Sequence, residues 1–325
     1  MDYDPKYFDL GKLGGTRVPK TANLAWRWRE GGKPQVYVFT PSVQLAVNVA
    51  LATRRPLLVA GEPGSGKTLL ARAVASALGW PYYRHTVTSR SQATDLLWSF
   101  DALRRLNHAT TPGETLQPMP HYVEPGAVWW GFDPETAAQR GLEPIDPASA
   151  RARDPAAAAG GDSAVVLVDE IDKADPDVPN DLLEPFDTRE FTVRETNERI
   201  VARRDVLLVL TTNTERELPP AFLRRCVTLA LDEPDAAWFE QLAARHFPKG
   251  DRTRHQQLAA AVMRLRGQAP ALQRRKPSTA EFLDAVRVCE QLGIDQTSPH
   301  WPDVVGSVLL KSDRPRAPGA GDGRA

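Results

Sequence analysis

Residues 61–68 read GEPGSGKT, and this stretch decides the fold. It matches the pattern G-x-x-x-x-G-K-[ST], in which backbone N–H groups of a glycine-rich loop surround phosphate oxygens. The apolar residues 56–60 before it predict a buried strand, and residues 67–79 after it predict a helix. Because the positive end of a helix favours anions at this position, we predict a phosphate-binding loop rather than a chance glycine turn.

The loop also predicts individual contacts with a nucleotide and its metal ion. Lys67 is expected to reach the β- and γ-phosphates, and the Thr68 hydroxyl is expected to ligate Mg²⁺. The predicted binding residues are consecutive: Gly61, Glu62, Pro63, Gly64, Ser65, Gly66, Lys67, Thr68 and Leu69.

A second motif, VVLVDEID, occupies residues 165–172. Its four apolar residues predict a buried strand that carries two carboxylates to its end. We expect Asp169 to bind Mg²⁺ through water and Glu170 to polarise the attacking water, so both belong to the predicted site. The alternative is a solvated turn. The predicted metal ligands are therefore Thr68 and Asp169.

A third motif, TTN at residues 211–213, ends the aliphatic run 206–210. Ligands of open parallel sheets bind at the carboxyl ends of the strands, so we predict a catalytic contact from Asn213. The alternative is that Asn213 is an ordinary turn residue. His85 has two interpretations as well: a hydrogen bond to Glu170, or a core histidine.

The wider pattern predicts an α/β fold with a parallel sheet wrapped by helices, because apolar strands alternate with helical segments. One helix is predicted over residues 40–55 with Thr40 as its N-cap, and another over residues 91–106. From about residue 234 onward only helical patterns follow, including a capping box that begins at Ser278. A small all-helical domain is therefore expected.

Composition excludes several classes of protein. The 325 residues contain 41 Lys and Arg and 41 Asp and Glu, so the formal net charge is zero and nucleic acid is not expected as a partner. The longest aliphatic runs are too short to cross a membrane, and the acidic N-terminus lacks an apolar signal segment. The two cysteines have no metal-ligand spacing. We expect a cytoplasmic protein with no membrane contact.

In this order the motifs resemble those of AAA+ ATPases, and more narrowly those of the MoxR-like branch. The resemblance covers about residues 40–310. Four stretches carry it: QLAVNVALATRRPLLVAGEPGSGKT (44–68), SQATDLLWSFD (91–101), DEIDKADPDVPNDLLEPFDTREFTV (169–193) and ELPPAFLRRC (217–226). It implies a P-loop NTPase AAA+ core, a helical lid domain, and ATP and Mg²⁺ as cofactors.

The resemblance also implies a division of the chain. We expect an irregular N-terminal extension over residues 1–35, an AAA+ α/β nucleotide-binding domain over residues 36–232 and a helical lid domain over residues 233–311. Residues 107–162 are expected to form a partly mobile insertion, and residues 312–325 a disordered tail.

In this family an arginine after a short helix acts on the ATP of the neighbouring subunit. The match to ELPPAFLRRC assigns this catalytic role to Arg225, with Arg224 as a second candidate. The alternative for both is a solvated surface charge. An arginine supplied in trans implies a homo-oligomeric ring, a hexamer. Glu184 matches a family glutamate and lies either at the subunit interface or in solvent.

Two further positions depart from the family or stay open. Relatives begin the penultimate lid helix with an arginine, but the match places Thr279 there, so Lys276 is the predicted phosphate contact. Trp129 and Trp130 either grip a client peptide or pack in the core. Because neighbours on a strand point to opposite faces, at least one is expected to pack.

The implied function is ATP hydrolysis that remodels or activates a partner protein, which in this branch is typically a protein with a von Willebrand factor A domain. Two alternatives stay open: a McrB-like nucleotide-driven nucleic-acid motor, and a non-hydrolysing nucleotide-dependent regulator in a conflict system. Zero net charge argues against the motor. The intact Lys67, Asp169, Glu170 and Asn213 argue against the regulator.

Overall fold

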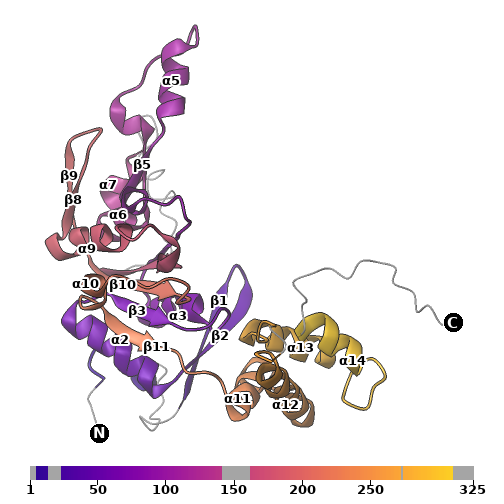
Figure 1. Cartoon of the computed structure of the whole chain (residues 1–325). Helices are drawn as coiled ribbons and strands as arrows, with labels where there is room; N and C mark the ends of the chain where they lie inside the picture. Colours follow the sequence, from indigo (N-terminus) through magenta and orange to yellow (C-terminus); the bar gives the residue numbers. More distant parts are fainter. Residues whose placement is uncertain (1–4, 14–22, 141–161, 272–273, 310–325) are drawn as a thin grey trace. The chain divides into compact units, whose positions relative to one another are not determined.

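The computed structural model describes residues 5–13, 23–140, 162–271 and 274–309. Contacts divide the chain into two compact units (Figure 1). The first comprises Met1–Glu62 and Lys67–Leu231, and the second comprises Pro63–Gly66 and Asp232–Ala325.

A five-stranded parallel sheet forms the centre of the first unit. Its strand order is β11-β3-β10-β7-β4, and every neighbouring pair is parallel. This confirms the predicted α/β fold. The strands are β3 (Leu57–Ala60), β4 (Tyr82–Thr86), β7 (Ser163–Asp169), β10 (Asp205–Thr212) and β11 (Val227–Ala230).

The sheet is buried on both faces, which explains why its strands are continuous apolar runs. Along β7, Val165 and Leu167 belong to the core cluster on one face, whereas Val166 and Val168 belong to the cluster on the other. All four are fully buried. Each such side chain contributes about 1.5–3 kcal/mol of burial free energy, so β7 is a strong anchor for the acidic residues that follow it.

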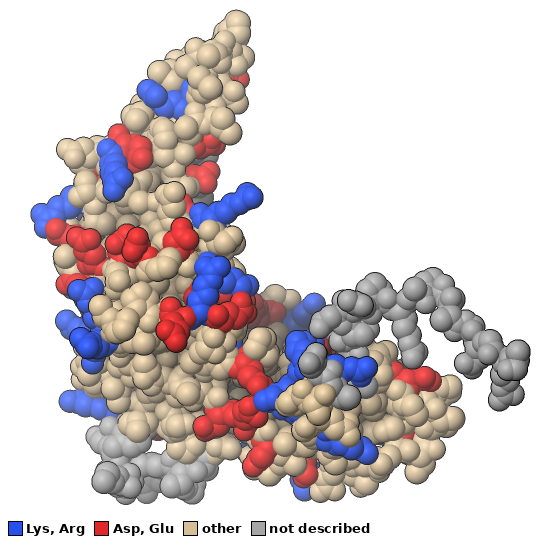
Figure 2. Space-filling model, in the orientation of Figure 1, with Lys and Arg blue, Asp and Glu red and all other residues tan. Residues whose placement is uncertain are grey.

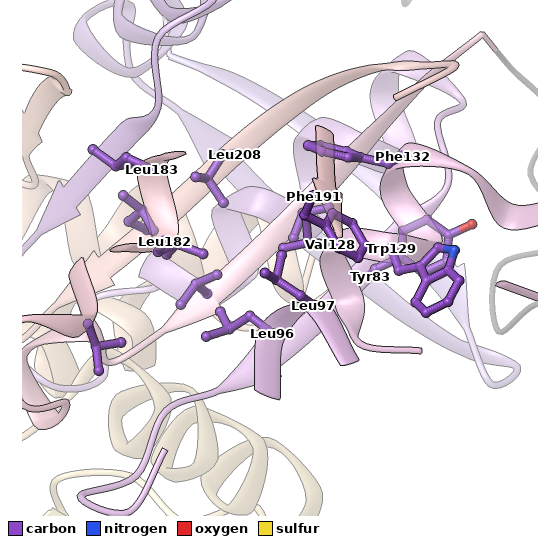
Figure 3. Close-up of a cluster of buried hydrophobic side chains, with 14 of the residues drawn as sticks. Tyr83, Leu96, Leu97, Val128, Trp129, Phe132, Leu182, Leu183, Phe191 and Leu208 are labelled. Carbon is purple, nitrogen blue, oxygen red and sulfur yellow. The ribbon is translucent and has the colours of Figure 1, made fainter. Parts of the chain in front are cut away.

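Helices cover the two faces. On one face lie α2 (Pro41–Thr53) and α3 (Lys67–Leu78), which bring Val47 and Leu70 into the core. On the other lie α4 (Ala93–Leu97), α6 (Ala127–Phe132) and α9 (Val178–Thr188); Figure 3 shows their buried side chains together. The predicted N-cap of α2 is present, since the Thr40 hydroxyl accepts a hydrogen bond from the backbone N–H of Val43 at 3.3 Å.

The expectation of an irregular extension over residues 1–35 was wrong for its second half. Strands β1 (Leu24–Glu30) and β2 (Lys33–Phe39) form an antiparallel hairpin, and a short helix, α1 (Leu10–Leu13), precedes them. Gly31 and Gly32 turn the chain with positive φ angles of 53° and 78°, which side chains disfavour. Phe39 is buried against Phe8, at 5.3 Å between ring centroids, so the hairpin belongs to the core.

The single helix expected over residues 91–106 was also wrong. The segment instead contains α4, then strand β5 (Trp98–Phe100), then α5 (Ala102–Thr110). β5 pairs with β6 (Val123–Pro125), a partner that lies too far along the sequence for helical periodicity to reveal it. Figure 1 shows α5 projecting from the first unit.

The predicted insertion over residues 107–162 is in part well-packed structure. It includes η1 (Met119–Tyr122), α6 and α7 (Pro134–Ala138). Residues 141–161 lie outside the described residues.

The tryptophans 129 and 130 lie on a helix rather than on the expected strand. Trp129 is fully buried (Figure 3), and its indole N–H donates to the Thr136 hydroxyl at 2.9 Å. Trp130 is partly buried and stacks on Tyr83, at 6.4 Å between ring centroids. Both therefore pack against the sheet.

The remaining elements of the first unit follow β7 along the chain. Past η2 (Ile171–Lys173) and α9, strands β8 (Glu190–Val193) and β9 (Glu198–Val201) form an antiparallel hairpin. The short helix α10 (Pro220–Leu223) leads into β11.

The second unit is helical. The Ser278 capping box is present, and Phe239 packs on Phe282 at 4.7 Å between ring centroids. None of the helices in the described residues is long and apolar enough to cross a membrane. The predicted tail, residues 312–325, lies outside them. The elements are α11 (Ala236–His246), α12 (Arg252–Gln268), α13 (Thr279–Leu292), α14 (Trp301–Val304) and η3 (Val305–Leu309).

Candidate nucleotide-binding site

The glycine-rich loop connects β3 to α3, as the sequence predicts. Gly64 and Gly66 have φ angles of 76° and 94°, a region that residues with a Cβ rarely adopt. The loop needs glycine at both positions to curl its N–H groups around one centre. The Ser65 hydroxyl is buried and has no hydrogen-bond partner among the described residues. A buried hydroxyl without a partner suits an anionic ligand.

Lys67 is buried at the start of α3, with 6% of its surface exposed. Its ammonium group donates hydrogen bonds to the carbonyl oxygens of Gly61 and Glu62, at 2.7 and 2.9 Å. Burial lowers the pKa of Lys67, and the negative charge of Asp169 opposes this most strongly. The ammonium group of Lys67 therefore lies against the phosphate-binding loop, as its predicted contact with phosphate requires. Leu69 follows Thr68 in the first turn of α3.

Asp169 ends β7 and accepts hydrogen bonds from three side chains. The Thr68 hydroxyl lies 3.0 and 3.1 Å from its two oxygens, the Thr211 hydroxyl donates to Oδ1 at 2.6 Å, and an Arg84 nitrogen donates to Oδ2 at 2.7 Å. Asp169 is 4% exposed. The two predicted metal ligands, Thr68 and Asp169, are thus in direct contact.

Glu170 has a φ of 62° and a ψ of 48°, the left-handed region that is uncommon for residues other than glycine. Its backbone N–H donates to the Thr211 hydroxyl at 2.9 Å. Its carboxylate accepts from the Lys173 ammonium at 2.7 Å, and this hydrogen bond raises the pKa of Lys173. Asn213 Nδ2 lies 3.4 Å from Glu170 Oε1. The predicted catalytic side chains of Glu170 and Asn213 are therefore adjacent at the carboxyl end of the sheet.

The backbone of Asn213 is fixed by Asp172, a residue that the sequence motifs did not identify as part of the site. The Oδ2 atom of Asp172 accepts from the backbone N–H groups of Asn213 and Glu215, at 3.1 and 3.0 Å. Asp172 is buried, and its Oδ1 atom has no partner among the described residues. Since Asp172 lies on η2 directly after Glu170, it ties the turn after β10 to the turn after β7.

His85 does not bond Glu170 in this structure. It lies on β4 opposite Val168, and its Nε2 atom is buried without a hydrogen-bond partner among the described residues. Burial lowers the pKa of His85, and the negative charge of Asp95 opposes this shift.

Arg224 and Arg225 lie at the opposite end of the sheet from the loop. They directly precede β11, whose first residue pairs with Leu57 at the beginning of β3, whereas the loop leaves the far end of β3. Four strand residues separate the two ends, on the order of 13 Å. The Arg55 guanidinium donates to the carbonyl oxygens of both arginines, which fixes their backbone.

The side chains of these two arginines are exposed. Arg225 Nη1 lies 3.6 Å from Asp187 Oδ2 on α9, an ion pair between half-exposed groups. Glu184 lies on the same helix and is also exposed. Figure 2 shows acidic and basic side chains interspersed over the face in view.

Lys276 lies in the second unit. Its ammonium group donates to Glu233 Oε1 at 2.7 Å. Arg266 Nη2 lies 3.8 Å from the other oxygen of Glu233. Thr279 is the first residue of α13.

The donor set fits ATP and Mg²⁺. A metal ion of this kind takes oxygen ligands such as a hydroxyl and a carboxylate, and Thr68 and Asp169 provide both. Thr68 donates its proton to Asp169, so its oxygen lone pairs stay available. The loop glycines, the buried Ser65 hydroxyl and the Lys67 ammonium form the matching phosphate side.

Sequence reasoning missed four residues that contact the predicted groups: Arg84, Asp172, Lys173 and Thr211. Two of them left a signal. Thr211 is a polar residue that continues an aliphatic strand, and Arg84 is a charge inside a strand pattern. Thr211 departs from the apolar pattern of a central strand, and such departures concentrate at functional sites, whereas Arg84 lies on the edge strand β4 and is exposed, so its signal is weaker.

Comparison with known proteins places the chain in a family. The model of the AAA domain, dynein-related subfamily, matches residues 56–226. Among curated proteins none matches the chain. A crystal structure from Cytophaga hutchinsonii, named as an inferred ATPase, shares 15% identity over 82% of this chain and 79% of that chain. Its TM-score of 0.41 is too low to bear on function. The family match spans more than half of the residues, from the strand before the loop to the end of the arginine pair, and the chain therefore belongs to the dynein-related subfamily of AAA domain proteins.

Proposed function

We propose that this protein is an ATP-hydrolysing, Mg²⁺-dependent ATPase of the MoxR-like branch, and that it remodels or activates a partner protein as a hexameric ring. One observation carries the hydrolysis: four predicted groups meet at the carboxyl ends of β7 and β10 and the start of α3. They are Thr68, Asp169, Glu170 and Asn213.

The residues divide the chemistry among them. ATP supplies the phosphoryl group, and Mg²⁺ neutralises charge on the phosphates. Lys67 binds phosphate oxygens in place of the loop carbonyls that it now contacts. Glu170 accepts the proton of the attacking water, and Asn213 orients that carboxylate through the amide group 3.4 Å away.

The MoxR-like assignment rests on the four sequence matches described above. The family model that matches the chain is the broader one of the dynein-related subfamily. One of these matches includes residues 169–187, DEIDKADPDVPNDLLEPFD. Near its start, Asp172 accepts a hydrogen bond from the backbone N–H of Asn213, and at its end Asp187 pairs with Arg225. Both ends of the stretch therefore contact predicted catalytic residues.

The ring is inferred from the position of Arg225. The residue lies at the far end of the sheet from the loop of its own chain, and its guanidinium is exposed. A planar, permanently charged group in such a place suits a phosphate of a neighbouring copy. The partner, a protein with a von Willebrand factor A domain, is inferred from the resemblance. Zero net charge and the interspersed charges on the face in Figure 2 favour a protein partner over nucleic acid.

The test begins with turnover of ATP and GTP, with and without DNA. The expected result is ATP hydrolysis that DNA does not stimulate and that the Glu170→Gln variant loses while still binding ATP. The matched control is Glu124→Gln, an exposed glutamate on β6. Hydrolysis of GTP stimulated by DNA would favour the nucleic-acid motor.

The second step is purification of Glu170→Gln with ATP from its native cells. We expect a six-membered ring that retains a von Willebrand factor A-domain protein only when ATP is present. If wild type shows no turnover even with its captured partner, the protein is a non-hydrolysing regulator and the proposal fails.

A further inference from the structure

Arg84 is a charged residue in the middle of the predicted site that no motif accounts for. It lies on β4 opposite Leu167, two residues before the Asp169 position in the register. Alternate residues of a strand share a face, and Tyr82 and Leu167 both belong to the core cluster that contains α3. The Arg84 side chain is therefore on the face of the sheet where the phosphate-binding helix begins.

The contact it makes is with the predicted metal carboxylate. Arg84 Nη2 lies 2.7 Å from Asp169 Oδ2. The side chain of Asp169 is 6% exposed and that of Arg84 is 44% exposed. A buried carboxylate needs a compensating charge, and within the described residues the guanidinium of Arg84 is the cation bonded to it.

Two hydroxyl groups also hydrogen-bond to the Asp169 carboxylate. Oδ1 accepts from Thr211 at 2.6 Å and from Thr68 at 3.0 Å, and Thr68 also lies 3.1 Å from Oδ2. A carboxylate offers about four acceptor positions. Thr68 has one proton to share between the two oxygens, so the three donors leave one position open, and a water molecule bound to Mg²⁺ at Oδ2 would lie beside the positively charged guanidinium.

We propose that Arg84 is a positioning residue that holds Asp169 when the metal is absent and competes with Mg²⁺ for this carboxylate when Mg²⁺·ATP binds. The inference rests on the proposed function, because it takes Asp169 as the carboxylate that serves the metal. The exposed guanidinium of Arg84 can turn into solvent at a small cost in free energy, whereas the Asp169 carboxylate is held in place by its hydrogen bond from Thr211. The ion pair therefore competes with the metal and sets the Mg²⁺ concentration that the site requires.

The test uses the full chain with Glu170→Gln, which removes hydrolysis and leaves binding as the readout. Binding of a fluorescent ATP analogue is measured as Mg²⁺ is varied, in this parent and with Arg84→Gln added. We expect the half-saturating Mg²⁺ concentration to fall about three- to tenfold, the range set by exposed and charge-assisted pairs. Arg84→Lys, which keeps the charge, should stay close to the parent.

The matched control is Arg72→Gln. Arg72 lies on α3, pairs with Glu30 at 2.7 Å and is 38% exposed, so it loses a similar ion pair without touching Asp169. Its Mg²⁺ dependence should equal that of the parent. Thermal melting is a second readout: without Mg²⁺ and nucleotide, Arg84→Gln should melt below the parent, and adding Mg²⁺ with the ATP analogue should reduce the difference in melting temperature.

The outcomes separate the two proposals. If the parent binds the analogue but Arg84→Gln leaves its Mg²⁺ dependence unchanged, the positioning role of Arg84 is wrong and the proposed function stands. A higher Mg²⁺ requirement would also overturn it and would place Arg84 on the nucleotide. If the parent itself does not bind the analogue, the proposed function fails and this inference fails with it.

Discussion

At the scale of single residues, the site depends on hydroxyl groups that serve two partners at once. Thr211 is the central example. It donates to Asp169 and accepts from the Glu170 backbone, so it fixes the geometry between two adjacent predicted site residues. Thr68 similarly joins the phosphate-binding helix to β7. These two hydroxyl groups therefore connect the predicted metal ligand Asp169 to the Glu170 backbone and to helix α3.

Thr211→Val is predicted to cost about 1–3 kcal/mol of unfolding free energy, because it removes the shortest hydrogen bond to the buried Asp169 carboxylate and leaves the Glu170 backbone N–H without its acceptor. Valine has nearly the same shape, so packing changes little. Denaturant unfolding measures the loss. Thr192→Val, at an exposed position on β8, should change stability by less than about 0.5 kcal/mol. Equal effects in the two variants would contradict this account of Thr211.

His85 predicts a dependence of stability on pH. Its pKa is lowered by burial, so the folded protein binds fewer protons at this position than the unfolded chain. The unfolding free energy should therefore fall as the pH drops below about 6.5, the ordinary pKa of histidine, toward the lowered value. Unfolding measured at pH 7.5 and 5.5 tests this.

His85→Gln removes this titrating group and should reduce the difference between the two pH values. His255 is buried in the second unit and its pKa is also lowered, so part of the difference should persist. An unchanged difference in the variant would show that His85 does not contribute.

At the scale of elements, each end of a helix or strand in the site is fixed by a local device. The φ of 62° at Glu170 ends β7 sharply, and the glycines of the loop allow α3 to begin where phosphate is expected. In the second unit, a capping box fixes the start of α13. The Ser278 hydroxyl accepts from the Glu281 N–H at 3.3 Å, and Glu281 accepts from the Ser278 N–H at 2.8 Å.

Ser278→Ala should loosen the first turn of α13, since it removes a cap worth about 1 kcal/mol. Hydrogen exchange is the suitable measurement, because it reports each helix separately. The Glu281 amide should exchange about fivefold faster, and the middle of α12 should not change. Ser99→Ala, on an exposed position of β5, is the control and should leave α13 unaffected. No acceleration at Glu281 would mean that the cap contributes little.

At the scale of the whole molecule, the two ends of the parallel sheet have different roles. The carboxyl ends of the strands carry the phosphate-binding loop and the acidic residues, and the amino end of β11 carries the arginine pair. One chain therefore presents two complementary parts of a site at places that are far apart. Under the proposed function, a second copy of the chain completes such a site.

Arg225→Ala is predicted to bind ATP normally and to lose about 10³–10⁵-fold in hydrolysis, the range typical of an arginine supplied in trans. Mixing it with Glu170→Gln should restore part of the activity, because each variant provides what the other lacks. Steady-state ATP hydrolysis of the mixture measures this. Arg54→Ala, an exposed arginine paired with Asp205 in the same unit, is the control. Full activity of Arg225→Ala would rule out the role.

Local signals in the sequence were enough for much of the fold. The strands β3, β7 and β10 are continuous apolar runs that only a buried parallel sheet accommodates, and the loop at residues 61–68 needs glycine for its backbone. The α2 cap and the α13 capping box are equally local. These features depend on neighbours within a few residues, which the sequence states directly.

Features that depend on distant partners required the tertiary structure. The strand β5 pairs with β6 more than twenty residues later, and Trp129 is buried because the sheet lies behind it. The sequence alone determined the parallel sheet, the phosphate-binding loop and the order of acidic residue, amide and arginine along the chain. Tertiary structure decided that Arg84 and Thr211 share the Asp169 carboxylate, because hydrogen bonds between strands join residues that are 42 and 85 positions apart.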